Sequence, residues 1–137
     1  MLAYAGPKED ALAVFDRFLA AVTAADIDSA MGVFWPDVMF FSPSPSMPDL
    51  ATALEPVRKY FATGMSSRKP NEMKATSPEA SALVASDSVV LISGLWQTER
   101  VVDGKPTLTP YRISIAVTKR AGEWRIAQFH TSTRPVR

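Results

Sequence analysis

Several residue types that carry chemistry in other proteins are rare or absent in this chain of 137 residues. There is no cysteine, which excludes disulfides, thiolate nucleophiles and zinc–thiolate sites. There is one histidine, so a histidine-rich metal site is excluded too. The sequence also lacks a phosphate-binding glycine loop and a nucleophile elbow. We therefore expect neither a metal nor a cofactor.

Neither a strong net charge nor a long apolar segment is present. The 15 basic and 14 acidic residues leave a net charge of +1, which gives no electrostatic reason to expect nucleic acid or an anionic membrane as partner. No apolar run approaches the roughly 20 residues that cross a bilayer. The first residues lack the basic start and apolar stretch of a secretory signal. We expect a cytoplasmic protein.

What the sequence does contain is typical of one globular domain. Hydrophobic residues make up 47% and charged residues 21%, which is enough apolar material for a core. We expect a single domain over residues 1–137, with its core between about 8 and 135.

The first half of the chain predicts three helices and a short strand. Apolar residues recur at helical spacing over 9–25, with Pro7 at or just before the first turn. Asp26 is expected to cap a second helix that runs to about Phe34 and is stopped by Pro36 and Asp37. A strand is predicted at 38–41, followed by a stiff proline-rich loop at 42–48. A third helix is predicted at 56–62, with Pro56 at its first position and Gly64 ending it in a left-handed conformation.

From about Asn71 the apolar period changes from near 3.6 to near 2, which predicts antiparallel strands. Asp103-Gly104 and residues 120–123 are expected to form turns, and Gly94 is expected to mark a kink or bulge. The predicted fold is α+β: a cone-shaped, curved antiparallel sheet (a half-barrel) with three helices across its concave side and an apolar pocket inside. The expected strands are 72–84 with a proline break, 88–101, 107–118 and 124–132.

Four segments resemble a known family. Residues 34–43 (FWPDVMFFSP) and 122–135 (GEWRIAQFHTSTRP) are similar to the association domain of calcium/calmodulin-dependent protein kinase II and its small bacterial relatives, within the nuclear transport factor 2-like superfamily. Residues 56–61 and 110–112 are weaker matches. The resemblance covers about residues 10–135. It implies a pocket inside the cone and a homodimer formed through the open face of the sheet, but no single function, because that fold hosts enzymes, adaptors and hubs.

His130 and Arg112 are the leading candidate site residues. His130, the only histidine, shares a face of its strand with Gln128, and we expect it to face the hollow as a general base or as a donor to an acidic ligand. The alternative is a structural histidine. Arg112 matches a carboxylate geometrically, although an exposed arginine is the commoner case. The resemblance favours a ligand contact for both. Further candidate ligand-binding residues are Trp96, Tyr111, Gln128, Phe40 and Tyr60.

Missing acids weaken the case for an enzyme. Isomerases of the ketosteroid type need a carboxylate base, and residues 38–48 contain no acid. Whether the chain is an enzyme therefore stays open. The leading hypothesis is a domain that binds a small organic molecule, for example a carboxylate. The alternatives are an enzyme that uses His130 as base on a small apolar substrate, and an oligomerisation or adaptor module without a ligand.

Overall fold

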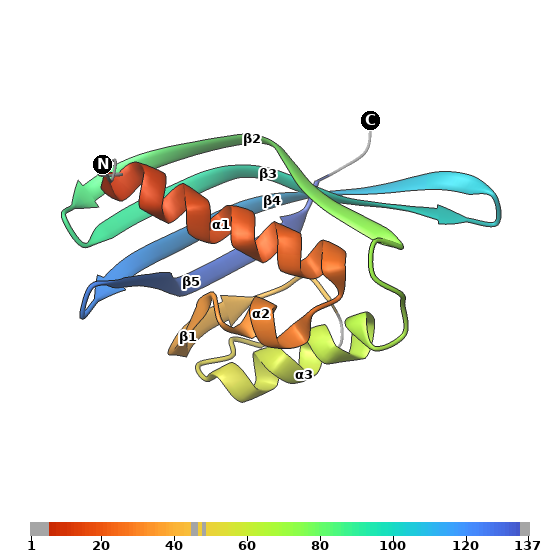
Figure 1. The fold of residues 1–137 in the computed structure, drawn as a ribbon, viewed down its shortest axis with the longest axis horizontal. Helices are drawn as coiled ribbons and strands as arrows, with labels where there is room; N and C mark the ends of the chain where they lie inside the picture. The colour runs from red at the N-terminus through yellow and green to blue at the C-terminus, as the bar shows by residue number, and fades with distance from the viewer. Residues whose placement is uncertain (1–5, 45–46, 48, 135–137) are drawn as a thin grey trace, which may run out of the picture.

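A computed structural model describes residues 6–44, 47 and 49–134 of the chain. A single curled sheet carries helices on one side, and a long β-hairpin projects beyond the body (Figure 1). The elements, in chain order, are α1 (Pro7–Ala24), α2 (Ile27–Met31), β1 (Phe34–Phe41), α3 (Leu54–Met65), β2 (Met73–Ser86), β3 (Val89–Val102), β4 (Lys105–Arg120) and β5 (Glu123–Thr133).

The predicted α+β architecture is confirmed, with one difference in the sheet. The strand order is β1-β5-β4-β3-β2, and the three pairs from β5 to β2 are antiparallel as expected. The edge strand β1 instead pairs with β5 in parallel. The two turns sit where the sequence places them: Asp103, Gly104, Ala121 and Gly122 all have positive φ, as tight hairpin turns require.

The first helix and the cap of the second are as predicted. Pro7 occupies the first turn of α1, and Asp26 caps α2 by accepting a hydrogen bond from the Ser29 backbone N–H at 3.1 Å. The end predicted for α2 is wrong, because the helix stops at Met31 and Phe34 opens a strand. Pro36 lies inside β1, between Phe34 and Met39, where the register with β5 is interrupted and a residue without an N–H is tolerated.

Helix α3 is longer than predicted at both ends. It starts at Leu54, so Pro56 is its third residue rather than its first. Gly64 is not a left-handed stop, because the helix continues to Met65 and the Ser66 N–H still donates to the Ala62 carbonyl at 2.9 Å. Of the loop predicted at 42–48, Pro45, Ser46 and Pro48 lie outside the described residues.

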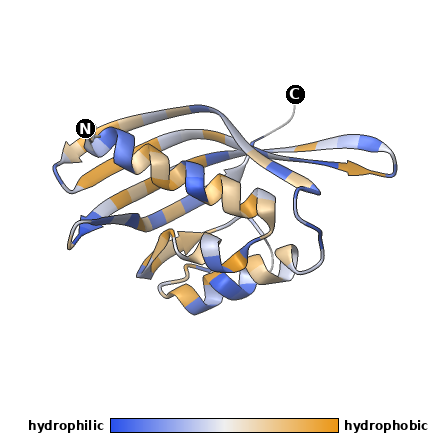
Figure 2. Ribbon diagram, viewed as in Figure 1, coloured by the Kyte–Doolittle hydropathy of each residue, from blue (hydrophilic) through white to orange (hydrophobic). Residues whose placement is uncertain are grey.

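The core fills the space between the helices and the inner face of the sheet. Hydrophobic and hydrophilic residues alternate along α1 and along the long strands (Figure 2), as a one-sided core requires. Phe18 of α1 is fully buried and makes ring contacts with Phe34, Phe61, Trp96 and Phe129 at centroid distances of 5.2–5.8 Å. This aromatic cluster fixes α1 and α3 over the sheet. In the described part of the chain, no helix is long and apolar enough to span a membrane.

Candidate functional site

A pocket that opens to solvent on one side, here called the interior pocket, lies between the helices and the inner face of the sheet, with a cavity volume of about 360 Å³. Helix α3 and the loop after it form one wall, and β2, β3 and β4 form the other. Among the described residues that line it there are two arginines and no acid. The lining is Val22, Tyr60, Phe61, Thr63, Gly64, Met65, Ser67, Arg68, Met73, Trp96, Thr98, Arg100 and Tyr111.

The sheet side of the interior pocket is an aromatic wall. Trp96 and Tyr111 face each other across the β3–β4 register and stack with their centroids 4.7 Å apart and an interplanar angle of 22°. The indole N–H of Trp96 donates to the buried Thr131 hydroxyl at 2.9 Å. That hydroxyl donates in turn to the Arg112 carbonyl at 3.0 Å. The indole is therefore held in one orientation before any ligand arrives.

Arg68 brings a half-paired guanidinium to the opposite wall. Its Nη2 donates to the Val22 carbonyl at 2.6 Å, which ties the loop after α3 to the end of α1. Its Nη1 is buried, and no described residue accepts a hydrogen bond from it. Burial lowers the pKa of Arg68; the carboxylate of Glu72 opposes this, and the positive charge of Arg100 adds to it. The two guanidiniums are thus close enough to repel each other.

Two tyrosine hydroxyls also belong to the interior pocket. Tyr60 of α3 accepts a hydrogen bond from the Ser42 hydroxyl at 2.8 Å. Burial raises the pKa of Tyr111, the nearby Tyr60 raises it further, and a hydrogen bond from Thr98 partly opposes the shift. The Tyr111 phenol therefore stays protonated at neutral pH.

The structure brings together only some of the predicted ligand-binding residues. Trp96, Tyr111 and Tyr60 line the interior pocket. Phe40 is fully buried beside it, stacked on Phe129 at 4.9 Å and 5.9 Å from the Tyr60 ring. Phe40 is therefore a core residue behind the pocket wall.

His130, Arg112 and Gln128 are exposed on the other side of the sheet. The expectation that His130 faces the hollow is wrong, because β5 contains one extra residue: Ile126 pairs with Val117 and Gln128 with Ala116, so Ala127 is a bulge. The bulge reverses the alternation of faces, so Phe129 and Thr131 are buried beyond it while Gln128 and His130 point outward. His130 thus cannot act as base on a molecule in the interior pocket.

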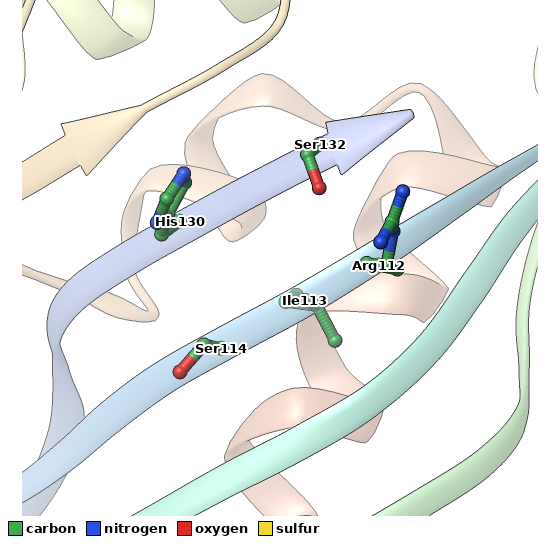
Figure 3. Close-up of a pocket in the computed structure, with 5 residues that line it drawn as sticks. All are labelled: Arg112, Ile113, Ser114, His130 and Ser132. Carbon is green, nitrogen blue, oxygen red and sulfur yellow. The ribbon is translucent and has the colours of Figure 1, made fainter. Parts of the chain in front are cut away.

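We call the side of the sheet opposite the helices the open face. A shallow hollow of about 210 Å³ on it is lined by Arg112, Ile113, Ser114, His130 and Ser132. Figure 3 shows His130 and Ser132 on β5 and Arg112 and Ser114 on the neighbouring β4, with His130 opposite Ser114 and Ser132 opposite Arg112. His130 pairs with Ser114, and its ring lies 5.3 Å from that of Phe41. Whether Arg112 and His130 contact a ligand here stays a prediction.

Arg68 and Arg100 are the site residues that sequence reasoning missed. Arg100 follows Trp96 and Thr98 at even spacing on β3, so a strand alternation starting from Trp96 points to it. Arg68 lies in a loop and carries no such signal. Trp35 is outside this lining: it donates its indole N–H to the Thr118 carbonyl at 3.2 Å and packs beneath Arg120 and Arg125.

Solved structures of known proteins share this fold. The association domain of C. elegans calcium/calmodulin-dependent protein kinase II superposes with a TM-score of 0.80 at 19% identity, covering 92% of this chain and 95% of that one. The kinase II hub of S. rosetta gives 0.78 at 26% identity, covering 96% and 100%. A ketosteroid isomerase-like protein from Erwinia carotovora atroseptica gives 0.74 at 16% identity, covering 97% and 100%.

A search of curated proteins found no match. The family model for the SnoaL-like domain, in contrast, matches residues 11–136 and so covers nearly the whole chain. Together with a nuclear transport factor 2-like fold, that match shows that the chain belongs to the SnoaL-like domain family.

Proposed function

We propose that this chain binds a small organic carboxylate in the interior pocket and that two copies associate through the open face. The observation that carries the first part is the pair of guanidiniums, Arg68 and Arg100, that line this pocket. A carboxylate matches the planar fork of a guanidinium and accepts charge-assisted hydrogen bonds from it.

The charges around Arg68 favour an anion over a neutral ligand. Arg100 adds a second cation to the lining, and no described lining residue is acidic. The nearest opposing charge is Glu72, which is outside the lining and accepts a hydrogen bond from the Lys69 backbone N–H at 2.7 Å. Two guanidiniums facing one cavity repel each other less when an anion lies between them.

The rest of the interior pocket suits an apolar ligand body. Trp96 and Tyr111 offer stacked rings on one wall, and Phe61, Met65 and Met73 offer apolar surface on the other. A cavity of about 360 Å³ has the size of ordinary small-molecule sites. An aromatic carboxylate such as benzoate combines both requirements and serves as the first probe.

The test compares benzoate with benzamide, its neutral counterpart, by calorimetry and thermal denaturation. We expect saturable benzoate binding that raises the melting temperature, with little effect of benzamide. Arg68→Met keeps the length of the side chain without its charge and should weaken benzoate binding about tenfold to a hundredfold, from the 1.5–3 kcal/mol of a charge-assisted hydrogen bond. Arg17→Met, exposed on α1, is the matched control.

Arg112→Met separates this proposal from a ligand site on the open face. We expect the variant to bind benzoate like the wild type, because Arg112 is exposed on the far side of the sheet. Loss of binding in Arg112→Met with retention in Arg68→Met would move the ligand to the hollow beside His130. Equal binding of benzoate and benzamide would contradict an anion site altogether.

The second part of the proposal, a homodimer, rests on large apolar side chains exposed on the open face. Leu91 lies between the buried Val90 and Ile92, and Met39 and Phe41 flank the buried Phe40, so the exposed residues point away from the helices. A soluble monomer rarely leaves such a set uncovered. The solved hub and association domains of similar fold belong to assembling proteins by name, which supports this reading. The set is Met39, Phe41, Leu83, Leu91, Val101 and Leu108.

Leu91 and Leu50 form a matched pair for testing the dimer. Their exposed fractions are 42% and 43%, but Leu50 lies in the loop before α3 and not on the open face. We expect sedimentation or light scattering to show a dimer for the wild type and Leu50→Lys, and a monomer for Leu91→Lys. A wild-type monomer at high concentration, or a dimer of Leu91→Lys as tight as the wild type, would overturn this part.

A further inference from the structure

The two tyrosine hydroxyls of the interior pocket are not used by carboxylate binding at Arg68. Tyr60 already accepts the hydrogen of the Ser42 hydroxyl, and Tyr111 lies on the same cavity with its ring stacked on Trp96. Each phenol therefore keeps its own hydrogen to donate. Among the described residues, none is found accepting a bond from either phenol. Both side chains line the pocket, so the two free donors share one cavity with the arginines.

The tyrosines and the arginines occupy different ends of the interior pocket. On the sheet, Tyr111 pairs with Trp96, and Arg100 lies four residues further along β3, or roughly 13 Å at about 3.3 Å per residue. On the facing wall, Tyr60 is in the middle of α3 and Arg68 follows the end of that helix. On both walls the tyrosine comes first and the arginine follows, further along the strand or beyond the end of the helix. The pocket thus has an arginine end and a tyrosine end, with the Trp96 ring at the tyrosine end and apolar side chains such as Met65 between the walls.

We infer that the ligand is a two-ended molecule: an aromatic or similarly flat carboxylic acid that carries a carbonyl oxygen at the end remote from its carboxylate. The Arg68 and Arg100 guanidiniums hold the carboxylate, and the Tyr60 and Tyr111 hydroxyls donate to the carbonyl. A carbonyl accepts two hydrogen bonds, which matches two donors. A ligand with an apolar far end would leave both phenol hydrogens unpaired on entering the pocket. The class is therefore keto acids rather than simple fatty or aryl acids.

This inference rests on the proposed carboxylate site, and the probes keep the two apart. 4-Acetylbenzoate has the required carbonyl, and 4-isopropylbenzoate has nearly the same shape without it. We expect calorimetry on the full chain to give about tenfold tighter binding of 4-acetylbenzoate, because each neutral hydrogen bond contributes a factor of a few. In the Tyr60→Phe/Tyr111→Phe double variant the ratio should fall to about one, with the affinity for 4-isopropylbenzoate unchanged.

Each result decides between the two levels of the proposal. If the wild type binds both acids equally and Arg68→Met binds neither, the carbonyl inference is overturned and the carboxylate site stands. A tenfold preference that persists in the double tyrosine variant would overturn the role of the tyrosines. Binding of neither acid would overturn both. Because the changes remove only hydroxyls, the melting temperature of the unliganded double variant checks that the pocket is still folded.

Discussion

Gly94 is the position where the structure predicts the largest effect for the smallest change. A methyl group added there by Gly94→Ala would lie 2.3 Å from the Glu79 carbonyl oxygen and 2.7 Å from the Ala80 Cα. Real Cβ atoms essentially never come within 3.0 Å of such neighbours. Both atoms are backbone atoms of β2, so no side chain can rotate away, and the strand itself must move by roughly 1 Å.

The cause of this close approach is a bulge in β2. Thr76 pairs with Gln97 and Glu79 with Leu95, so β2 has one more residue than β3 over this stretch, and Ala80 then pairs with Gly94. The sequence predicts a kink at Gly94, and the structure shows that the extra residue is on the neighbouring strand. Glycine is required there because the bulged backbone crosses the place where a Cβ would be.

We expect Gly94→Ala to lower the free energy of unfolding by about 2–3 kcal/mol. Overpacking costs about 1–3 kcal/mol, and a clash with backbone on both sides belongs at the upper end. The loss of unfolded-state freedom returns about 0.4–1 kcal/mol. For a chain of this size the melting temperature should fall by about 6–12 °C. Urea denaturation followed by tryptophan fluorescence measures the change, with an unaltered m-value.

Gly64→Ala makes the same chemical change where nothing lies within 4 Å of the new Cβ. Gly64 is inside α3, so alanine should stabilise the protein by about 0.5–1 kcal/mol. The two variants should therefore shift stability in opposite directions. If Gly94→Ala is as stable as the wild type, or if both variants change the free energy of unfolding equally, the close approach of the β2 backbone to Gly94 is refuted.

Three further predictions concern the core and two titrating groups. Phe18→Ala removes the fully buried centre of the aromatic cluster and should cost about 3–5 kcal/mol in urea denaturation; a loss below about 1 kcal/mol would contradict the packing. Because the pKa of Tyr111 is raised in the folded protein, its contribution to stability is complete below the unfolded pKa of about 10 and is lost as pH rises through the folded pKa. Tyr111→Phe should therefore reduce the fall in melting temperature at alkaline pH. The pKa of Asp26 is lowered, chiefly by a hydrogen bond from the Ser29 side chain, so its contribution to stability is present above the unfolded pKa of about 3.9 and is lost as pH falls through the folded pKa. Asp26→Asn keeps a helix cap and should reduce the fall in melting temperature at acid pH.

Local chemistry made much of the fold predictable. The spacing of apolar residues in 9–25 indicates α1, the Asp26 cap is read from one side chain, and Asp103-Gly104 marks the β3–β4 turn because two positive φ angles favour those residues. Element ends were less predictable. Phe34 joins a strand rather than α2 because it pairs with Ile126, more than ninety positions away in the chain.

The site was harder to predict because single residues decide its geometry. Trp96 and Tyr111 both line the pocket, since β3 and β4 pair without interruption across that region. On β5, the bulge at Ala127 turns His130 outward, and strict alternation along the strand does not predict it. Arg68 enters the pocket only because its loop is tied to Val22 of α1, a contact between distant segments.

The alternation of side chains along β4 explains how one short chain can serve both proposed roles. Tyr111 faces the interior pocket while its neighbour Arg112 lies on the open face, so a ligand and a second copy of the chain would meet opposite sides of the same strand. The Thr131 hydroxyl of β5 is tied to both neighbouring parts of the sheet, because it accepts from the Trp96 indole of β3 and donates to the Arg112 backbone carbonyl of β4. A bonded, buried hydroxyl fixes β5 against β4 in one register. That register keeps the arginines and tyrosines of the pocket apart from the imidazole outside it, which is why substitutions on the two faces should have separable effects.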